Sequence, residues 1–139
     1  MLYEILTSKI LQACFEISKE LGAGFLESVY EKALLIAQDE KDVKAKSQVQ
    51  LKVKFRERIV RDFYADILIE NKILVELKAV SHLAKEHYAQ IINYLNATEI
   101  DVGLLVNFGN PKLEYKRFYR KSKSEQNCRN IIDEMQIKD

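Results

Sequence analysis

The sequence lacks the features that mark several classes of protein. It has only two cysteines, Cys14 and Cys128, without partners at metal-ligand spacing, so both are interpreted as reduced structural thiols. It has no apolar run of about eighteen residues, the length that a membrane-spanning helix needs. Its N-terminus has no basic region followed by an apolar segment, so no secretory signal is expected. We therefore expect a cytoplasmic protein without membrane segments.

An excess of charge of one sign is also missing. The 22 Lys and Arg residues against 21 Asp and Glu residues give a net charge of +1. Any surface for an anionic polymer must therefore come from local clustering of charge. With 47% hydrophobic and 31% charged residues, the composition is that of an ordinary soluble protein. The length of 139 residues is enough for one compact domain and too short for two.

The most informative stretch is residues 64–78, which is rich in Ile, Leu and Val but carries three charges in its apolar arms. It predicts two short antiparallel strands joined by a tight turn. A turn centred on Asn71 places Asp66 directly opposite Glu76. Lys78 shares a face with Glu76, because side chains alternate along a strand. Two carboxylates and one ammonium group then converge.

Two facing carboxylates on a partly buried face need a compensating cation. Hard oxygen ligands suit Mg²⁺ or Mn²⁺, which usually accept one or two protein carboxylates and complete their shell with water and substrate phosphate. Lys78 would then lie beside the metal-bound water or the scissile phosphate. In one alternative, Asp66 and Glu76 lie on a solvated face with Lys78 as an ordinary cross-strand partner. In another, a two-residue loop places Leu77 opposite Asp66 and separates the charges.

Two amphipathic helices are expected before this hairpin. Apolar residues at three-to-four spacing predict the first over residues 2–21, ended by Gly22-Ala23-Gly24. The second is expected over residues 26–39, with a buried stripe made of Leu26, Val29, Tyr30, Ala33, Leu34 and Ala37. Glu27 borders this stripe in the first turn, where a carboxylate also favours the helix dipole.

The remaining pattern predicts a mixed sheet. Residues 49–55 alternate as a half-buried strand with Val49, Leu51, Val53 and Phe55 on one side, and a second strand runs from about residue 59 or 61 to residue 69. A helix is expected over 83–97, a strand covered on both faces over 102–106, and an edge strand over 113–119. The strand at 102–106 should return parallel to the Glu76 strand through a right-handed crossover. The fold class is therefore α/β, with helices flanking a mixed central sheet.

Three short motifs stand in this framework. Asp66 is followed after nine residues by Glu76-Leu77-Lys78, residues 24–30 read Gly-x-x-Glu-x-x-Tyr, and Gln90 and Tyr94 form Gln-x-x-x-Tyr. Together they resemble the PD-(D/E)XK nuclease superfamily, specifically its GxxExxY family, with the QxxxY motif of RecB-like nucleases. The resemblance covers roughly residues 5–119, although Ala65 replaces the proline of the superfamily name. It implies the restriction-endonuclease-like αβββαβ core.

The resemblance also implies a function and residue roles. The function is metal-dependent hydrolysis of phosphodiester bonds in nucleic acid, with DNA favoured over RNA and Mg²⁺ or Mn²⁺ as cofactor. Glu27 becomes an additional ligand or a water-orienting group, and Gln90 and Tyr94 orient the lysine and contact the nucleic-acid backbone. Without the resemblance, Gln90 and Tyr94 are a packing or exposed pair. His82 and His87, five residues apart, do not face each other on a helix and are not assigned to the metal.

The C-terminal region adds basic residues interleaved with aromatics: Tyr115, Lys116, Arg117, Phe118, Tyr119, Arg120, Lys121 and Lys123. They either hold phosphates and stack bases or form a solvated strand edge. We divide the chain into a nuclease-like domain, 1–119, and a basic extension, 120–139, with a short helix that packs on the core or on a second subunit. A homodimer, a non-catalytic binding module that keeps this fold, and a hydrolase of another phosphate ester all stay open.

Overall fold

A computed structural model describes residues 3–120. Two helices come first and a third lies between the third and fourth of five strands. The helices are α1 (Glu4–Leu21), α2 (Glu27–Glu40) and α3 (Lys85–Ala97). The strands are β1 (Ala45–Phe55), β2 (Arg58–Ile69), β3 (Ile73–Lys78), β4 (Val102–Asn107) and β5 (Glu114–Tyr119). The order of elements expected from the sequence is confirmed, and the boundaries of α1, α2, α3 and β4 lie within two residues of those expected.

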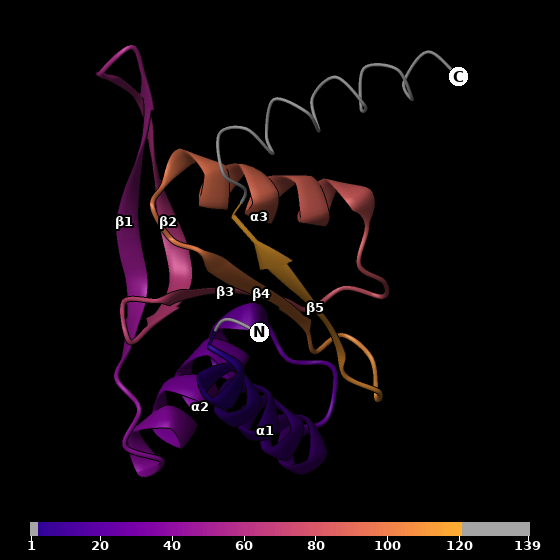
Figure 1. Cartoon of the computed structure of the whole chain (residues 1–139). Helices are drawn as coiled ribbons and strands as arrows, with labels where there is room; N and C mark the ends of the chain where they lie inside the picture. Colours follow the sequence, from indigo (N-terminus) through magenta and orange to yellow (C-terminus); the bar gives the residue numbers. More distant parts are fainter. Residues whose placement is uncertain (1–2, 121–139) are drawn as a thin grey trace.

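The molecule is built in three layers, with the sheet in the middle (Figure 1). The strands follow one another in the order β1-β2-β3-β4-β5, and β3 and β4 are the parallel pair. Helices α1 and α2 cover one face and α3, the crossover between β3 and β4, covers the other. This is the expected mixed α/β architecture of a restriction-endonuclease-like fold.

Each face of the sheet has its own apolar core. The larger core packs α1 and α2 against inward side chains of β2, β3 and β4, and the smaller one packs α3 against Leu74 and Leu105. All six residues of β4 are buried, as expected of a strand covered on both faces. Gly103 on β4 allows close approach of α3, because a Cβ there would lie 3.0 Å from the Ile91 side chain.

The β2–β3 hairpin has the register that was predicted from a turn centred on Asn71. Ile69 pairs with Ile73 and Ile67 with Val75, so the two-residue-loop alternative is wrong. Glu70 and Asn71 both adopt left-handed backbone conformations, with φ of 53° and 58°. The Glu70 carboxylate accepts a hydrogen bond from the Lys44 amide at 2.9 Å, and the Glu70 amide donates to the Lys44 carbonyl at 2.8 Å. Lys44 thereby holds the turn.

Beyond the hairpin, the side chains of β2 change the face of the sheet to which they point, and the change occurs at Asp66. Ile67 and Ile69 pack against α1 and α2, whereas Phe63 stacks on Tyr94 of α3 and Ala65 joins the α3 core. A regular strand would keep these alternate residues on one face. On β1, the residue opposite Asp66 is Gln48, which is left-handed at φ 51°. The backbone therefore twists sharply where Asp66 lies.

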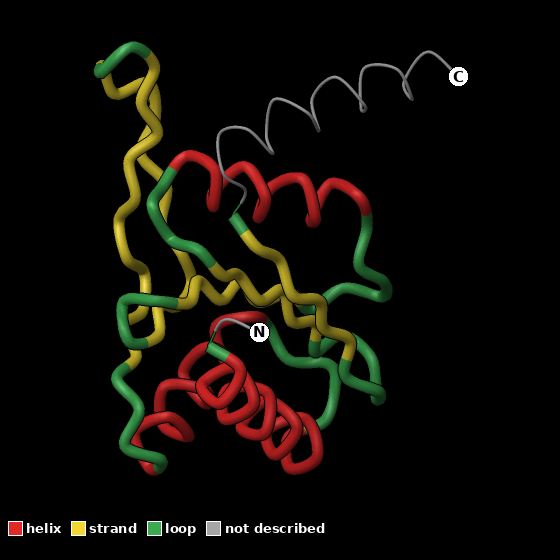
Figure 2. Tube along the Cα trace, viewed as in Figure 1, coloured by secondary structure: helices red, strands yellow, loops and turns green. Residues whose placement is uncertain are grey.

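Past this twist, β1 and β2 continue as a two-stranded ribbon that extends beyond the layer of α3 (Figure 2). Its two-residue turn, Arg56-Glu57, is left-handed at both positions, as in a type I′ hairpin. The predicted alternation holds for Leu51 and Val53, which are half-buried. It fails at Phe55, which is 60% exposed because no other element within residues 3–120 covers the end of the ribbon.

The expected buried stripe of α2 is only partly correct. Tyr30 and Leu34 are buried, but Leu26 is 78% exposed and Val29 36% exposed, because the first turn of the helix extends past the edge of the core. Tyr30 fixes the approach to this turn. Its ring stacks on Phe108 at 4.5 Å, and its hydroxyl donates to the Gly22 carbonyl at 2.6 Å and accepts from the Phe25 amide at 3.2 Å.

Part of the basic aromatic segment is held within the domain. Lys116 lies over the Tyr88 ring at 4.6 Å, Tyr115 packs edge-on against Phe15, and Arg120 forms an ion pair with Asp101 at 2.9 Å. These contacts favour the structural interpretation for β5. Lys121, Lys123, Cys128 and the expected terminal helix lie outside the described residues.

Two further expectations concern the described part of the chain. Cys14 is fully buried, and burial raises the pKa of its thiol to about 12, which keeps it protonated as an inert core residue. Among residues 3–120, no helix is both long enough and apolar enough to cross a membrane.

The Tyr30 hydroxyl gives a test of how α2 is positioned. Tyr30→Phe keeps the ring stack and removes two hydrogen bonds, leaving the Gly22 carbonyl without this donor. We expect the free energy of unfolding in urea to fall by about 1–3 kcal/mol. Tyr64→Phe, at a side chain that is 56% exposed, is the matched control and should leave stability unchanged. Equal stability of the two variants would contradict the stabilising role of the Tyr30 hydroxyl.

Candidate active site

The carboxyl groups of Asp66 and Glu76 meet where the β2–β3 ladder ends. Ile67 and Val75 form the last paired residues at this end, and Asp66 and Glu76 are the next pair in the same register. Their contacts run through side chains. The Leu77 amide donates to Asp66 Oδ2 at 2.8 Å, and the Asp66 amide lies 3.4 Å from Glu76 Oε1. The two carboxylates thereby replace part of the backbone ladder.

Glu76 is an unusual residue for the centre of a sheet. Its side chain is only 6% exposed, on a strand whose other residues are apolar or half-buried. Burial, and secondly the neighbouring Asp66 carboxylate, raise the pKa of its carboxyl from 4.5 to about 8, although Lys78 partly offsets the rise. A carboxylate in this position is costly unless positive charge is brought to it. The pair therefore forms a preformed site for a cation or a proton.

Leu77 and Lys78 complete the Glu-x-Lys segment in different ways. The amide and carbonyl of one strand residue point to the same side of the strand, so the Leu77 carbonyl also faces β2 and Asp66. Lys78 is half-buried at the end of β3, on the same face as Glu76, and acts on the charge of Glu76. The structure thus brings Asp66 and Glu76 together and places Lys78 within electrostatic range of Glu76.

Gln90 and Tyr94 lie on the helix that covers this face. Gln90 Nε2 donates to the Tyr94 hydroxyl at 2.7 Å, as their spacing on a helix allows. The pKa of Tyr94 is raised by partial burial and by the nearby Glu76 carboxylate. The Tyr94 ring stacks on Phe63 at 3.7 Å, which fixes it above the ribbon. Tyr94 therefore lies within electrostatic reach of the acidic pair.

Glu27 approaches the same pair from the opposite layer. It lines a cavity of about 210 Å³ together with Asp66 and Leu77, and the other lining residues are Ser28, Glu31 and Gln48. Glu31, one turn further along α2, is already held by Gln48, whose amide donates to it at 2.7 Å. No hydrogen-bond partner of the Glu27 carboxylate is found within residues 3–120. No sequence motif indicated the contribution of Gln48.

Neither histidine contributes to this cluster. His87 Nδ1 accepts a hydrogen bond from the Ala84 amide at 3.0 Å and so stabilises the start of α3. His82 is exposed in the loop before that helix.

A residue that sequence reasoning missed stabilises the loop after Lys78. Asn107 is fully buried. Its side-chain Oδ1 accepts a hydrogen bond from the Val80 backbone amide at 3.0 Å, and its Nδ2 donates to the Val80 carbonyl at 2.9 Å. Gly109 lies against the Val80 backbone so closely that a Cβ would clash. A polar residue ending an otherwise apolar strand was the available signal.

Comparison with known proteins bears on this arrangement. A family profile described as "PD-(D/E)XK nuclease superfamily" matches residues 4–118. The chain belongs to this superfamily. Its members are typically phosphodiesterases that cut nucleic acid and generally use divalent metals such as Mg²⁺. A search of curated proteins finds no match.

A solved structure titled "Crystal structure of SSO0001" is similar to this chain at a TM-score of 0.49 and 16% sequence identity. The similarity covers 97% of this chain and 68% of that one.

The superfamily's usual cofactor can be compared with the donors present. Within residues 3–120, no three His, Cys, Asp or Glu side chains are close enough to form a ligand set of their own. Mg²⁺ does not require such a set, since it usually binds one or two carboxylates and keeps several waters. The Asp66 and Glu76 carboxylates and the Leu77 carbonyl are hard oxygen donors of this kind, beside a cavity that Glu27 also lines. The residues present therefore suit such an ion.

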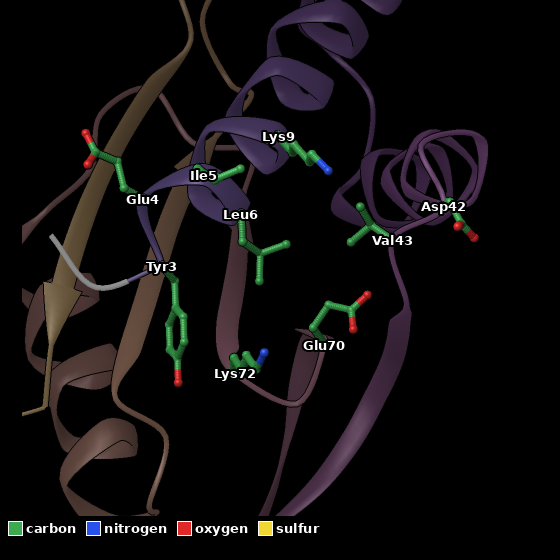
Figure 3. Close-up of a pocket in the computed structure, with 9 residues that line it drawn as sticks. All are labelled: Tyr3, Glu4, Ile5, Leu6, Lys9, Asp42, Val43, Glu70 and Lys72. Carbon is green, nitrogen blue, oxygen red and sulfur yellow. The ribbon is translucent and has the colours of Figure 1, made fainter.

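A cavity larger than the one beside Asp66 lies elsewhere. It has a volume of about 610 Å³ and lies at the turn end of the β2–β3 hairpin. Glu70 and Lys72 of the turn line one side, and the start of α1 lines the other (Figure 3). Asp66, Glu76 and Lys78 do not line it. Its size alone is a weaker guide to chemistry than the buried acid pair, since residues with strongly perturbed pKa values cluster at functional sites.

The raised pKa of Glu76 predicts how stability depends on pH without divalent metal. The folded protein holds the Glu76 proton up to about pH 8, whereas an unfolded carboxyl loses it near 4.5. Stability should therefore be highest below pH 4.5 for this group and fall as pH rises towards 8, by at most ~1.4 kcal/mol per pH unit. Urea unfolding in EDTA measures this. Glu76→Gln should flatten the dependence, and an identical pH profile in that variant would contradict the assignment.

Proposed function

We propose that this protein is a metal-dependent nuclease that hydrolyses phosphodiester bonds, with DNA favoured over RNA as substrate. The observation that carries the proposal is the buried Glu76 carboxylate held against Asp66 at the end of the β2–β3 ladder. Such a pair is costly to maintain in a sheet without a cationic ligand. The Gly-x-x-Glu-x-x-Tyr motif at residues 24–30 supports placement in the GxxExxY family, and Gln90 and Tyr94 support a RecB-like site.

The residues have distinct roles in this proposal. Asp66, Glu76 and the Leu77 carbonyl would hold one or two Mg²⁺ or Mn²⁺ ions, with Glu27 as an additional ligand. When bound, such an ion polarises the phosphodiester and lowers the pKa of an attacking water. Lys78 helps to activate that water or neutralises the charge that builds on the phosphorus oxygens.

Gln90 and Tyr94 act by positioning. Their 2.7 Å hydrogen bond and the Tyr94 stack on Phe63 fix the α3 face above the acid pair. In the proposal, Gln90 and Tyr94 orient Lys78 and contact the nucleic-acid backbone. Glu27, on the other layer of helices, lines the same cavity as Asp66.

Other functions remain as distinct outcomes. A non-catalytic module that binds nucleic acid or a protein would keep the fold without needing Glu76-dependent metal binding. A hydrolase of another phosphate ester would turn over nucleotides without cutting chains. We also propose a cytoplasmic location and leave the monomer and the homodimer as alternatives.

Cleavage assays test the nuclease directly. The purified chain is incubated with single-stranded and double-stranded DNA and RNA in Mg²⁺ or Mn²⁺, beside an EDTA control. We expect cleavage that is abolished by EDTA and by Glu76→Ala, and reduced by at least ~10²-fold in Lys78→Ala, because a positioned proton-transfer group typically contributes that much. Calorimetry should detect metal binding in Lys78→Ala and none in Glu76→Ala. Full cleavage by Lys78→Ala would overturn its role.

Glu27 has a matched control on the same helix. Glu27→Gln and Glu31→Gln each remove one charge from the cavity beside Asp66, but Glu31 is already bound to Gln48. We expect Glu27→Gln to slow cleavage and to weaken metal binding measured by calorimetry, while Glu31→Gln changes both less. Equal effects of the two substitutions would remove Glu27 from the proposed ligands and leave only a general charge effect.

A further inference from the structure

The outer part of the β1–β2 ribbon, residues 52–62, has no packing function that explains its length. β3 pairs with β2 only through Ile67 to Ile69, so residues 52–62 are paired only with each other. Every residue from 54 to 62 is exposed. At about 3.3 Å per residue, β2 extends roughly 26 Å from Asp66 to Arg58. We call residues 52–62 the distal ribbon; its tip extends past α3 in Figure 2.

The distal ribbon concentrates positive charge. It carries two carboxylates, Glu57 and Asp62, against five cations, namely Lys52, Lys54, Arg56, Arg58 and Arg61. Its net charge is therefore +3, whereas that of the whole chain is +1. Among the described residues, no carboxylate lies within ion-pair distance of these cations, and Arg56 lies over the Phe55 ring at 4.9 Å. This is the local clustering that the overall charge did not reveal.

The base of the ribbon adjoins the candidate active site. Phe63, one residue beyond the distal ribbon, stacks on Tyr94, and the positive charge of Arg61 acts to lower the pKa of Tyr94. The charge of Glu76 acts in the opposite direction and raises the pKa of Tyr94. The cations therefore begin near Tyr94, on the helix that covers the acid pair, and continue outwards along one continuous element.

The ribbon also exposes apolar side chains. Phe55 is 60% exposed, Ile59 51% and Val60 60%. Aromatic and aliphatic side chains among cations can stack on bases or insert between them. The other physical interpretation is protection of an edge, because lysines on an exposed strand discourage pairing with a second chain. Edge protection does not account for Arg56 and Arg58 at the turn, where the ladder ends.

We propose that the distal ribbon is a nucleic-acid-binding arm that holds the phosphate backbone of the substrate beside the cleavage site. The proposal rests on the proposed nuclease function and deepens it. A two-stranded ribbon fits the major groove of a duplex, and cations at its tip would contact phosphates that flank the scissile one. Binding through the arm is independent of metal and of Glu76.

The test compares two variants of the full chain that lose the same charge. Lys54→Gln/Arg56→Gln/Arg58→Gln alters the arm, and Lys9→Gln/Lys19→Gln/Lys112→Gln alters exposed lysines on α1 and in the β4–β5 loop. Fluorescence anisotropy in EDTA measures binding of a short labelled DNA duplex, the matching single strand and the corresponding RNA over a range of salt. The arm variant should bind more weakly, with a salt slope shallower by between about two and three, since each lost phosphate contact removes about 0.9.

The outcomes separate the arm from the nuclease. Cleavage by the wild type together with equal binding by the two variants would overturn the arm and leave the nuclease. If only the arm variant binds more weakly and the wild type cuts no substrate, the arm is supported and the nuclease is overturned. A wild type that binds none of the probes overturns the arm. The arm is also overturned if analytical ultracentrifugation finds a wild-type dimer, the arm variant is a monomer, and the two bind nucleic acid equally.

Discussion

The hydrogen bond from the Leu77 amide to the Asp66 carboxylate is the interaction around which the site is arranged. It takes the place of a ladder bond between β2 and β3, so the two strands separate where the backbone of β2 twists. The twist turns Phe63 and Ala65 towards α3 while Ile67 and Ile69 stay against α1 and α2. One carboxylate therefore lies at the point where both layers of helices meet the sheet.

This position explains how groups far apart in the sequence reach one acid pair. Glu27 comes from the α1–α2 layer and Tyr94 from the α3 layer, while Glu76 stands between them on β3. The supports behind these groups are partly buried hydrogen bonds and stacked rings: Tyr30 with Gly22 and Phe108, and Asn107 with Val80. A rigid surrounding of this kind preserves the close approach of two carboxylates that would otherwise separate.

Much of this arrangement follows from sequence periodicity, and the exceptions have physical causes. The change from period two to period three-to-four located the hairpin and α3, and a turn centred on Asn71 set the register. Periodicity could not decide between loop lengths, because the left-handed Glu70 is held by Lys44, which lies just before β1 and is distant in the sequence. It also could not foresee that Leu26 and Phe55 are exposed, since an apolar stripe does not reveal where its partner layer ends. The left-handed Gln48 opposite Asp66 has no sequence signature.

The strand order has a consequence for folding. Because β1 to β5 lie in the sheet in chain order, most pairings form between consecutive segments with short loops. Only the parallel β3–β4 pair requires a long crossover, the one that contains α3. Local pairings form faster than distant ones, since less chain entropy is lost before contacts are made. Asp66 and Glu76 belong to the most local of these units, so the acid pair can assemble in the hairpin before either layer of helices closes over it.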